Sequence, residues 1–189
     1  MLIVSWSGTC PARPSLDGPR FLPVLTKSVD EDDFNGISRT CKLFLSITDR
    51  LRTTLTISNQ TVAVRILRRC RNIKRVNVHP RMRGDLDRLI SAISRSGVAI
   101  EALDLSYQFS FPSSWSVREA GMGTLGRTLK ILICKNIEWL LNRDLVTIAE
   151  AFPALEELDI SNMEKYVSDA GIEVLASKLA HLRKINVSG

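Results

Sequence analysis

Features that would identify a membrane protein or a secreted protein are missing from this sequence. No apolar run approaches the roughly 18 residues that a membrane-spanning helix needs, so we expect no membrane association. The apolar start, Met1 to Trp6, is short and contains no basic residue, which argues against a signal peptide.

Residues that catalysis or metal binding would require are also scarce. The only histidines are His79 and His181, and the cysteines form no C-x-x-C pair, so a zinc site has no support. Neither G-x-S-x-G nor H-E-x-x-H occurs, which leaves hydrolase chemistry without its usual residues. Asp104 and Asp159 could share one groove, but carboxylates on a row of strands usually face solvent. We therefore predict no catalytic residue, no metal and no cofactor.

The composition is that of an ordinary folded protein. Of the 189 residues, 44% are hydrophobic and 24% are charged, which excludes disorder over the whole length and suits one domain, or a small module plus a larger one. The net charge of +6 permits an acidic partner without requiring one. Because no signal peptide is expected, we interpret Cys10, Cys41, Cys70 and Cys134 as reduced thiols and expect a cytoplasmic or nuclear location.

A hexad with the pattern apolar-x-x-apolar-x-apolar occurs five times at nearly even spacing. The hexads begin at Ile73, Ile100, Leu129, Leu155 and Leu182, which are 27, 29, 26 and 27 residues apart. A near-constant step of this size is typical of leucine-rich repeats. The pattern predicts five short strands whose alternate side chains point to opposite faces.

The segments between the hexads carry apolar residues at helical spacing. The stripes are Leu86, Leu89, Ile90 and Ile93, then Leu145, Ile148, Ala149 and Phe152, and finally Ile172, Leu175, Ala176 and Leu179. Near the predicted helix starts stand Asp85, Asp144 and either Ser168 or Asp169, whose short polar side chains can cap free N–H groups. A further strand is predicted over residues 51–57.

These patterns predict an α/β fold, a leucine-rich-repeat solenoid with a parallel row of strands and with helices on the convex side. Each strand-plus-helix unit has too much apolar surface to stand alone, so stacked units would share a continuous core. The alternative is a doubly wound α/β domain, which also alternates strands and helices. The fixed period and the lack of a glycine-rich phosphate loop favour the solenoid.

The concave surface of such a solenoid is the expected binding surface. Two rows of side chains should point to it: Arg75, Ala102, Ile131, Glu157 and Lys184, and Asn77, Asp104, Ile133, Asp159 and Asn186. From these rows we predict a substrate-binding site made of Arg75, Asn77, Asp104, Ile131, Ile133, Glu157, Asp159 and Lys184. Ile131 and Ile133 would form an apolar patch with an acidic rim, which suits a protein partner. Alternatively, the third strand is shifted in register and both isoleucines belong to the core.

A basic segment and an aromatic segment each allow two interpretations. Residues 65–83 contain eight basic side chains and no acidic one, which suits phosphate binding. No aromatic residue is interleaved with them, so we expect a solvated basic face rather than a nucleic-acid site. Residues 109–115 are predicted to form a loop. The aromatic side chains near it could line a binding surface, but we expect them to pack against the rim of the stack; they are Tyr107, Phe109, Phe111 and Trp115.

The segment before the repeats resembles the second half of an F-box. It contains an acidic run, residues 30–33, and then the sequence Ser38-Arg39-Thr40-Cys41-Lys42-Leu43-Phe44. From about residue 22 onward the chain is similar to the F-box/leucine-rich-repeat proteins, especially the plant-type ones with cysteine-containing repeats. Cys70-Arg71-Asn72-Ile73 matches in part the Cys-Pro-x-Leu that opens strands in that family. The F-box is incomplete, because only six residues separate Leu22-Pro23 from Asp30, where the family has a full helix.

The resemblance implies a substrate-recognition adaptor of a cullin–RING ubiquitin ligase of the SCF type, which is not itself an enzyme. Residues 1–20 would be an unrelated leader, 21–50 the F-box-like helices and 51–189 the repeats. Ile37, Cys41 and Phe44 would bind the Skp-type adaptor, or would simply be the core of that helical module. The repeats would hold a protein substrate and so raise its local concentration near the ligase.

Two other functions stay open. One is a leucine-rich-repeat module that binds a protein without any ligase role, and the other is nucleic-acid association through the basic segment. The chain ends directly after a predicted strand, and we expect both of its ends to reflect a fragment or a truncated gene model.

Overall fold

The computed structural model describes residues 42–109, 111–137, 140–162 and 167–188. The chain divides into two compact units, residues 1–51 and 52–189. The described part of the first unit is one helix, α3 (Lys42–Leu51). It begins inside the segment 21–50 that was predicted to be helical and ends one residue after it, at Leu51.

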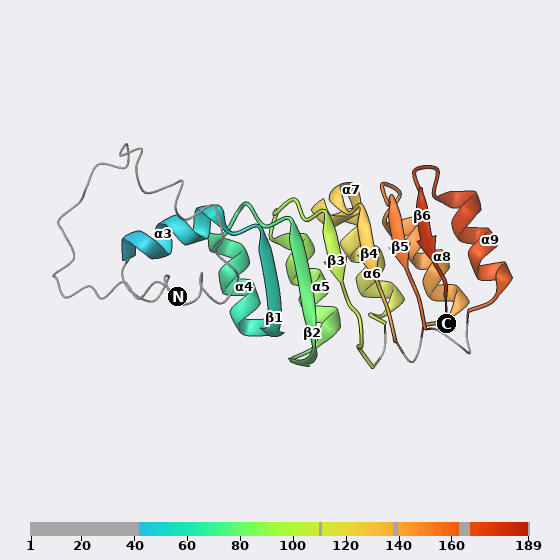
Figure 1. Cartoon of the computed structure of the whole chain (residues 1–189), viewed down its shortest axis with the longest axis horizontal. Helices are drawn as coiled ribbons and strands as arrows, with labels where there is room; N and C mark the ends of the chain where they lie inside the picture. The colour runs from blue at the N-terminus through green and yellow to red at the C-terminus, as the bar shows by residue number, and fades with distance from the viewer. Residues whose placement is uncertain (1–41, 110, 138–139, 163–166, 189) are drawn as a thin grey trace. The chain divides into compact units, whose positions relative to one another are not determined.

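The second unit is built on a parallel sheet of six strands, which lie side by side in chain order (Figure 1). They are β1 (Thr54–Asn59), β2 (Arg75–Arg83), β3 (Ala102–Asp104), β4 (Ile131–Ile133), β5 (Glu157–Asp159) and β6 (Lys184–Asn186). A doubly wound sheet reverses its strand order at one point, and this sheet has no such reversal. The predicted α/β fold with a parallel row of strands is therefore confirmed.

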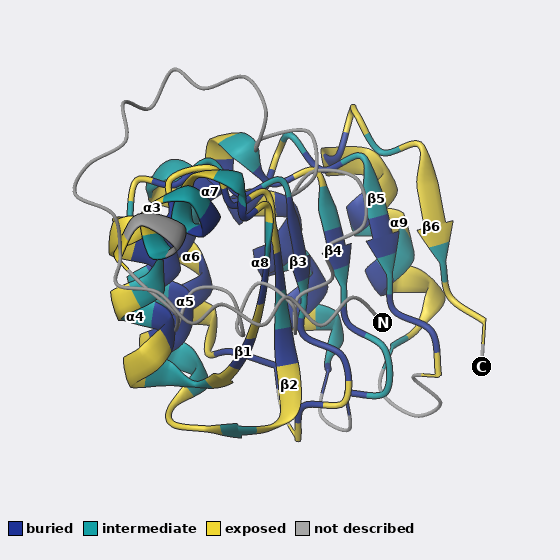
Figure 2. Ribbon diagram, turned by 60° about the vertical axis from the view of Figure 1, so that its left-hand side comes forward, coloured by how far each residue is buried: buried dark blue, intermediate teal, exposed yellow. Residues whose placement is uncertain are grey.

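The helices that connect these strands lie together on one face of the sheet (Figure 2). In the described part of the second unit they are α4 (Gln60–Arg69), α5 (Leu86–Arg95), α6 (Ser114–Met122), α7 (Thr124–Thr128), α8 (Asn142–Ala151) and α9 (Asp169–Lys178). Along this layer α5 packs on α6, α6 on α8 and α8 on α9. None of these helices covers the opposite face of the sheet, which we call the open face.

The five hexads occupy equivalent positions in adjacent strands. Val76 pairs with Leu103, which continues through Leu132 and Leu158 to Ile185, so the fourth residue of every hexad lies in one row. The first residues of four hexads, Ile73, Ile100, Leu129 and Leu155, are completely buried. The inward orientation predicted for the hexads is thus confirmed for these four. In the fifth hexad, Ile185 on the edge strand β6 and Val187 just after it are exposed.

The helix starts follow the predicted caps in part. The Asp85 carboxylate accepts from the backbone N–H groups of Asp87 and Arg88, as predicted. Asp144 instead lies in the first turn of α8, where its carboxylate accepts from the N–H of Leu141 at 2.9 Å. Ser168 precedes α9 but does not cap it with its side chain, since its hydroxyl accepts from the Asn142 side chain.

The structure contains a further strand–helix unit whose helix the sequence pattern did not reveal. Leu55 and Ile57 of β1 pair with Val76 and Val78, so they occupy the fourth and sixth hexad positions. The first position is Arg52 instead of an apolar residue, which hides the motif. The predicted strand over 51–57 is correspondingly wrong at its start, because Leu51 still belongs to α3 and β1 begins at Thr54.

The predicted loop over 109–115 is also wrong in part. Ser113 caps a helix by accepting from the N–H of Ser116, so Ser114 and Trp115 form the first turn of α6. Phe111 is buried, as expected for packing against the stack. Tyr107, Phe109 and Trp115 are instead largely exposed.

Candidate functional site

The two predicted rows lie on the open face in register. Arg75, Ala102, Ile131, Glu157 and Lys184 are paired neighbours across the strands, and Asn77, Asp104, Ile133, Asp159 and Asn186 form the second row. Parallel strands without bulges keep this alignment because each turn of the chain returns at the same level. The structure therefore brings all eight predicted substrate-binding residues onto one surface.

The two rows are only partly accessible. Arg75 and Lys184, at the two ends of the first row, are exposed, whereas the six predicted residues between them in the two rows are half-buried. Ala102 is buried, contrary to its predicted place on the surface, because its single methyl group lies between the longer neighbours Arg75 and Ile131.

The register of β4 decides between the two interpretations of its isoleucines. Ile131 and Ile133 flank the fully buried Leu132 and are themselves half-buried. The alternative of a shifted strand with both isoleucines in the core is wrong. They form an apolar patch between Ala102 and Asp104 on one side and Glu157 and Asp159 on the other.

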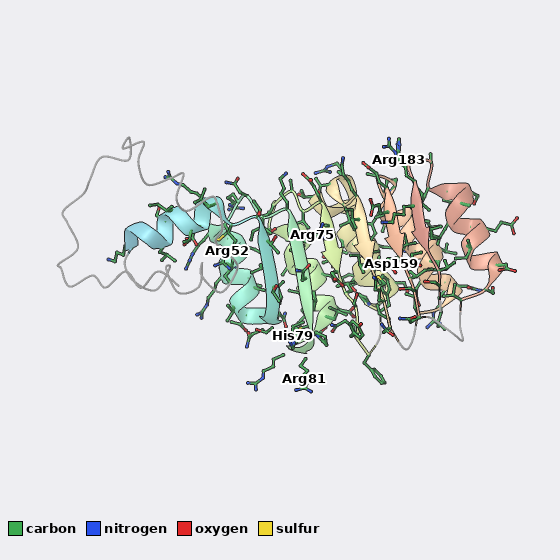
Figure 3. All side chains as sticks on the ribbon, in the orientation of Figure 1. Arg52, Arg75, His79, Arg81, Asp159 and Arg183 are labelled. Atoms are coloured by element: carbon green, nitrogen blue, oxygen red, sulfur yellow. The ribbon has the colours of Figure 1, made fainter. Side chains whose placement is uncertain are left out.

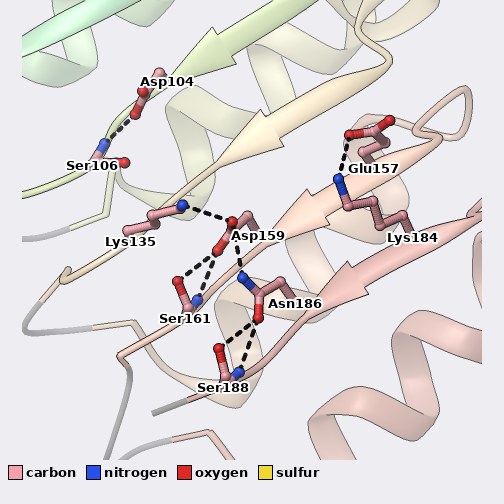
Figure 4. Close-up of polar contacts among 9 residues, drawn as sticks. All are labelled: Asp104, Ser106, Lys135, Glu157, Asp159, Ser161, Lys184, Asn186 and Ser188. Atoms are coloured by element: carbon pink, nitrogen blue, oxygen red, sulfur yellow. Dashed lines mark hydrogen bonds and ion pairs between the residues drawn. The ribbon is translucent and has the colours of Figure 1, made fainter.

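Asp159 is the centre of a polar network on the open face (Figure 4). Its carboxylate accepts from the Ser161 hydroxyl at 2.7 Å and the Asn186 amide at 3.2 Å, and it pairs with the Lys135 ammonium at 3.1 Å. Partial burial alone would raise the pKa of Asp159, but the hydrogen bonds from Ser161, Lys135 and Asn186 outweigh it, so the pKa is lowered. The group is ionised and fixed in position, which suits it to orient a partner by charge.

The same turn follows three of the strands. The side chains of Asp104, Asp159 and Asn186 each accept from the backbone N–H two residues later, in Ser106, Ser161 and Ser188. Such Asx turns use the side chain to replace a backbone hydrogen bond. These three polar side chains therefore stabilise the turns through hydrogen bonds and also lie on the open face.

Charged side chains of both signs line the strand row. Lys184 lies 3.6 Å from Glu157, and at the amino ends of the strands Lys74 pairs with Glu101 at 2.6 Å and Lys130 with Glu156 at 3.0 Å. These pairs are well exposed and each contributes little stability. Their effect is to give the face a mixed pattern of charge.

The two described cysteines, Cys70 and Cys134, are buried in the core and are not bonded to one another, which agrees with the prediction of reduced thiols. Burial, and then the charges of Asp104 and Asp159, raises the pKa of the Cys134 thiol well above its usual value. A thiol held in the protonated form is a poor nucleophile. Cys134 is therefore a packing residue of the core and not a nucleophile.

The predicted adaptor-binding residues lie largely outside the described residues. This applies to Ile37 and Cys41, and to the side chain of Phe44, whose backbone belongs to α3. Within the described ranges, no group of three or more His, Cys, Asp or Glu side chains could hold a metal ion. No described helix is both long and apolar enough to cross a bilayer.

The sequence reasoning missed a hollow at the carboxyl edge of the sheet. It has a volume of about 510 Å³ and is lined by residues of β2 and of the turns after β3, β4 and β5, including Pro80, Tyr107, Phe109, Asn136 and Asn162. The hexad step would have identified part of it, because Tyr107, Asn136 and Asn162 each stand two residues after the last position of a hexad.

Comparison with models of known protein families and with curated proteins finds no match for this chain.

Proposed function

We propose that the second unit is a leucine-rich-repeat solenoid that recognises a target protein on its open face, and that it does so as the substrate-recognition adaptor of an SCF-type ubiquitin ligase. The observation that carries the first part is the alignment of the five hexads in adjacent parallel strands, with helices on one face only. Stacked repeats of this kind leave their strand row free as an extended binding surface.

The chemistry of the open face favours a protein partner. Two half-buried isoleucines, Ile131 and Ile133, lie beside the ionised Asp159 and the pair of Glu157 with Lys184. An apolar centre with a charged rim is the usual anatomy of a protein-binding surface. The apolar centre would supply binding energy and the charges would set orientation and specificity.

The ligase role is supported by the F-box-like sequence of residues 30–46 immediately before the repeats. In this role the chain catalyses nothing, and it increases the rate of ubiquitin transfer by holding the target near the ligase. A protein-binding module without a ligase role is the second candidate, because the segment between Leu22-Pro23 and Asp30 is too short for the first helix of an F-box.

A pull-down of the full chain with a purified Skp-type adaptor tests the ligase role. We expect a complex that is lost in the variant Ile37→Asp/Phe44→Asp. The circular dichroism spectrum and thermal midpoint of the full chain should stay close to those of the wild type, which would show that the variant is folded. Failure of the folded wild-type chain to bind the adaptor would reject the ligase role and leave the binding module.

Crosslinking in cell extract tests the open face itself. The variant Ile131→Ala/Ile133→Ala should lose crosslinked proteins that the wild-type chain retains. Val62→Ala is the matched control, because Val62 is an exposed aliphatic residue on α4, in the helix layer. Equal losses from both variants would contradict recognition by the open face.

A further inference from the structure

The second unit has a strongly uneven distribution of charge. Residues 52–100 contain eleven Arg and Lys against two Asp, whereas residues 101–189 contain nine Arg and Lys against twelve Asp and Glu. Most described carboxylates of the acidic part are within reach of Lys or Arg, as Asp159 is of Lys135. Arg75, Arg81 and Arg83 of β2, in contrast, are exposed and form no ion pair with any described residue.

Arg81 and Arg83 lie on the last part of β2, beyond its regular pairing with β1. β2 pairs regularly with β1 as far as Val78, and the register then shifts so that Arg83 lies opposite Asn59. Met82 packs against the core, while Arg81 and Arg83 on either side of it are exposed. Figure 3 shows Arg81 beside His79 at the carboxyl end of β2, with Arg75 at the start of the strand.

The fold brings aromatic side chains to this basic extension. The buried Gln108 donates from its side-chain amide to the backbone carbonyl of His79 at 3.3 Å, which ties the turn after β3 to the end of β2. On either side of Gln108, Tyr107 is 59% and Phe109 is 72% exposed, and both line the hollow together with Pro80. The aromatic residues that were missing from the basic segment of the sequence are thus supplied by the turn after the next strand, β3.

Tyr107 has an unfavourable backbone conformation. Its φ is 62°, and the equivalent residues of the next two units, Asn136 and Asn162, have φ values of 51° and 61°. Asparagine adopts this left-handed conformation readily, whereas a bulky residue does so at a cost in energy. Such strain is concentrated at functional sites. Here it holds an aromatic ring at an exposed position where folding alone would favour asparagine.

We propose that this edge binds single-stranded nucleic acid, a function independent of the protein recognition proposed above. Bases would stack on Tyr107 and Phe109, and the phosphates would be neutralised by Arg81 and Arg83. Exposed aromatic rings beside arginines are the combination that single-strand-binding proteins use. The Asn136 and Asn162 side chains in the same hollow offer amide donors and acceptors to a base edge.

Other polyanions fit these groups less well. A duplex conceals the faces of its bases in the stack, so it could use the arginines but not the two rings. An acidic peptide would satisfy the arginines, yet its carboxylate side chains have no planar ring to stack on Tyr107 and Phe109. Of these three ligands, only single-stranded nucleic acid would use both the charge of the arginines and the faces of the two aromatic rings.

Fluorescence anisotropy of the full chain with fluorescein-labelled decauridylate RNA tests the stacking. Base–aromatic stacking contributes about 1–3 kcal/mol per base, so Phe109→Ala should weaken binding by about 5- to 150-fold. Trp115→Ala is the matched control, because Trp115 is also 72% exposed but lies in the first turn of α6 and does not line the hollow. Equal effects of the two variants, or no effect of Phe109→Ala, would overturn the proposal.

A salt series tests the phosphate contacts. Each phosphate contact on a single strand contributes about −0.7 to the slope of log K against log salt, so Arg81→Gln should make the slope shallower by about 0.7. Arg127→Gln on α7 removes the same charge from another exposed site and should leave the slope unchanged. Flat affinity across the series, or tighter binding of a labelled decaglutamate peptide than of the RNA, would overturn nucleic-acid binding and, in the second case, indicate an acidic protein partner.

Discussion

Tyr107, Asn136 and Asn162 occupy one structural position in three successive units, but only the first of them has a side chain that opposes the local backbone. The left-handed conformation costs a bulky L-residue about 1–2 kcal/mol and asparagine less. We therefore expect Tyr107→Asn to raise the free energy of unfolding by about 1 kcal/mol. Urea denaturation followed by circular dichroism measures it.

The reciprocal change is the control for Tyr107. Asn136→Tyr places the unfavourable residue in the neighbouring unit, so it should lower the free energy of unfolding by a similar amount. If Tyr107→Asn destabilised the protein instead, the ring of Tyr107 would be a packing residue, and its role in the hollow would have to be reconsidered.

Asp159 should make the stability of the fold depend on pH. Its pKa is lowered in the folded state, so the stability that it contributes is present above its ordinary value near 3.8 and is lost as the pH falls through the lowered pKa. Asp159→Asn should therefore reduce stability at pH 7, and the difference from wild type should shrink as the pH falls toward 2. Unfolding curves at pH 7, 5, 3 and 2 would show it, and a constant difference would contradict the assignment to the carboxylate.

The sequence could identify residues whose side of the sheet follows from strand alternation. It could not identify residues that only the three-dimensional fold brings together. The period of the hexads identified the core row and, apart from the buried Ala102, the open-face row, because strand alternation fixes which side chains are inside. It left open whether Ile131 and Ile133 belong to the surface or the core, and the structure decides this through the register of β4. The period could not reveal the neighbourhood of Arg81 and Phe109, which are far apart in the sequence and are brought to one edge by the Gln108 hydrogen bond.

At the scale of the element, α4 depends on a single capping residue. The Asn59 side chain accepts from the N–H groups of Thr61 and Val62. Loss of an N-cap costs about 1 kcal/mol, so Asn59→Ala should destabilise the protein by roughly that amount, whereas Asn59→Asp keeps the acceptor and should be nearly neutral. Equal destabilisation by both variants in urea denaturation would show that the amide NH₂ group, not the cap, matters.

The packing of α6 on α8 depends on a residue without a side chain. A Cβ atom added at Gly121 would lie 2.7 Å from the Cα of Ala151, which is backbone and cannot move aside cheaply. Overpacking of this kind costs about 1–3 kcal/mol, so Gly121→Ala should lower the thermal midpoint even though alanine favours helices. Met122→Ala, at the exposed next residue, is the control and should have little effect.

Elements were predictable where the apolar stripe was complete. The stripes of α5 and α8 were read correctly from their spacing, and Asp85 marked the start of α5. The helix α4 was not predicted, because three of its ten residues are arginines and only Ala63 and Leu67 are buried, so its apolar stripe is short. The start of α6 was missed because the serines at 113 and 114 resemble a loop when the Ser113 cap is not recognised.

For the whole second unit, stability should fall toward β6. The central row is buried from Val76 to Leu158, but Ile185 on β6 is exposed, as is Val187 just beyond the strand. Backbone amides of strands with less buried apolar surface open more often. In hydrogen–deuterium exchange read by mass spectrometry, peptides covering residues 184–186 should exchange faster than those covering β3 and β4. Uniform exchange across β2 to β6 would contradict this gradient.

The unbroken pairing from β2 to β6 gives the open face a regular repeat distance, which a segment of a partner lying across the strands would have to match. Neighbouring strands are separated by about 4.8 Å, and an α-helix rises about 5.4 Å per turn. A helix laid across five strands would thus fall out of step by only about 2.4 Å, less than half a turn. The same-side residues of an extended chain repeat about every 6.8 Å, so their spacing would depart from that of the strands within a few strands. The strand spacing of this surface therefore suits a helical segment of a partner better than an extended one.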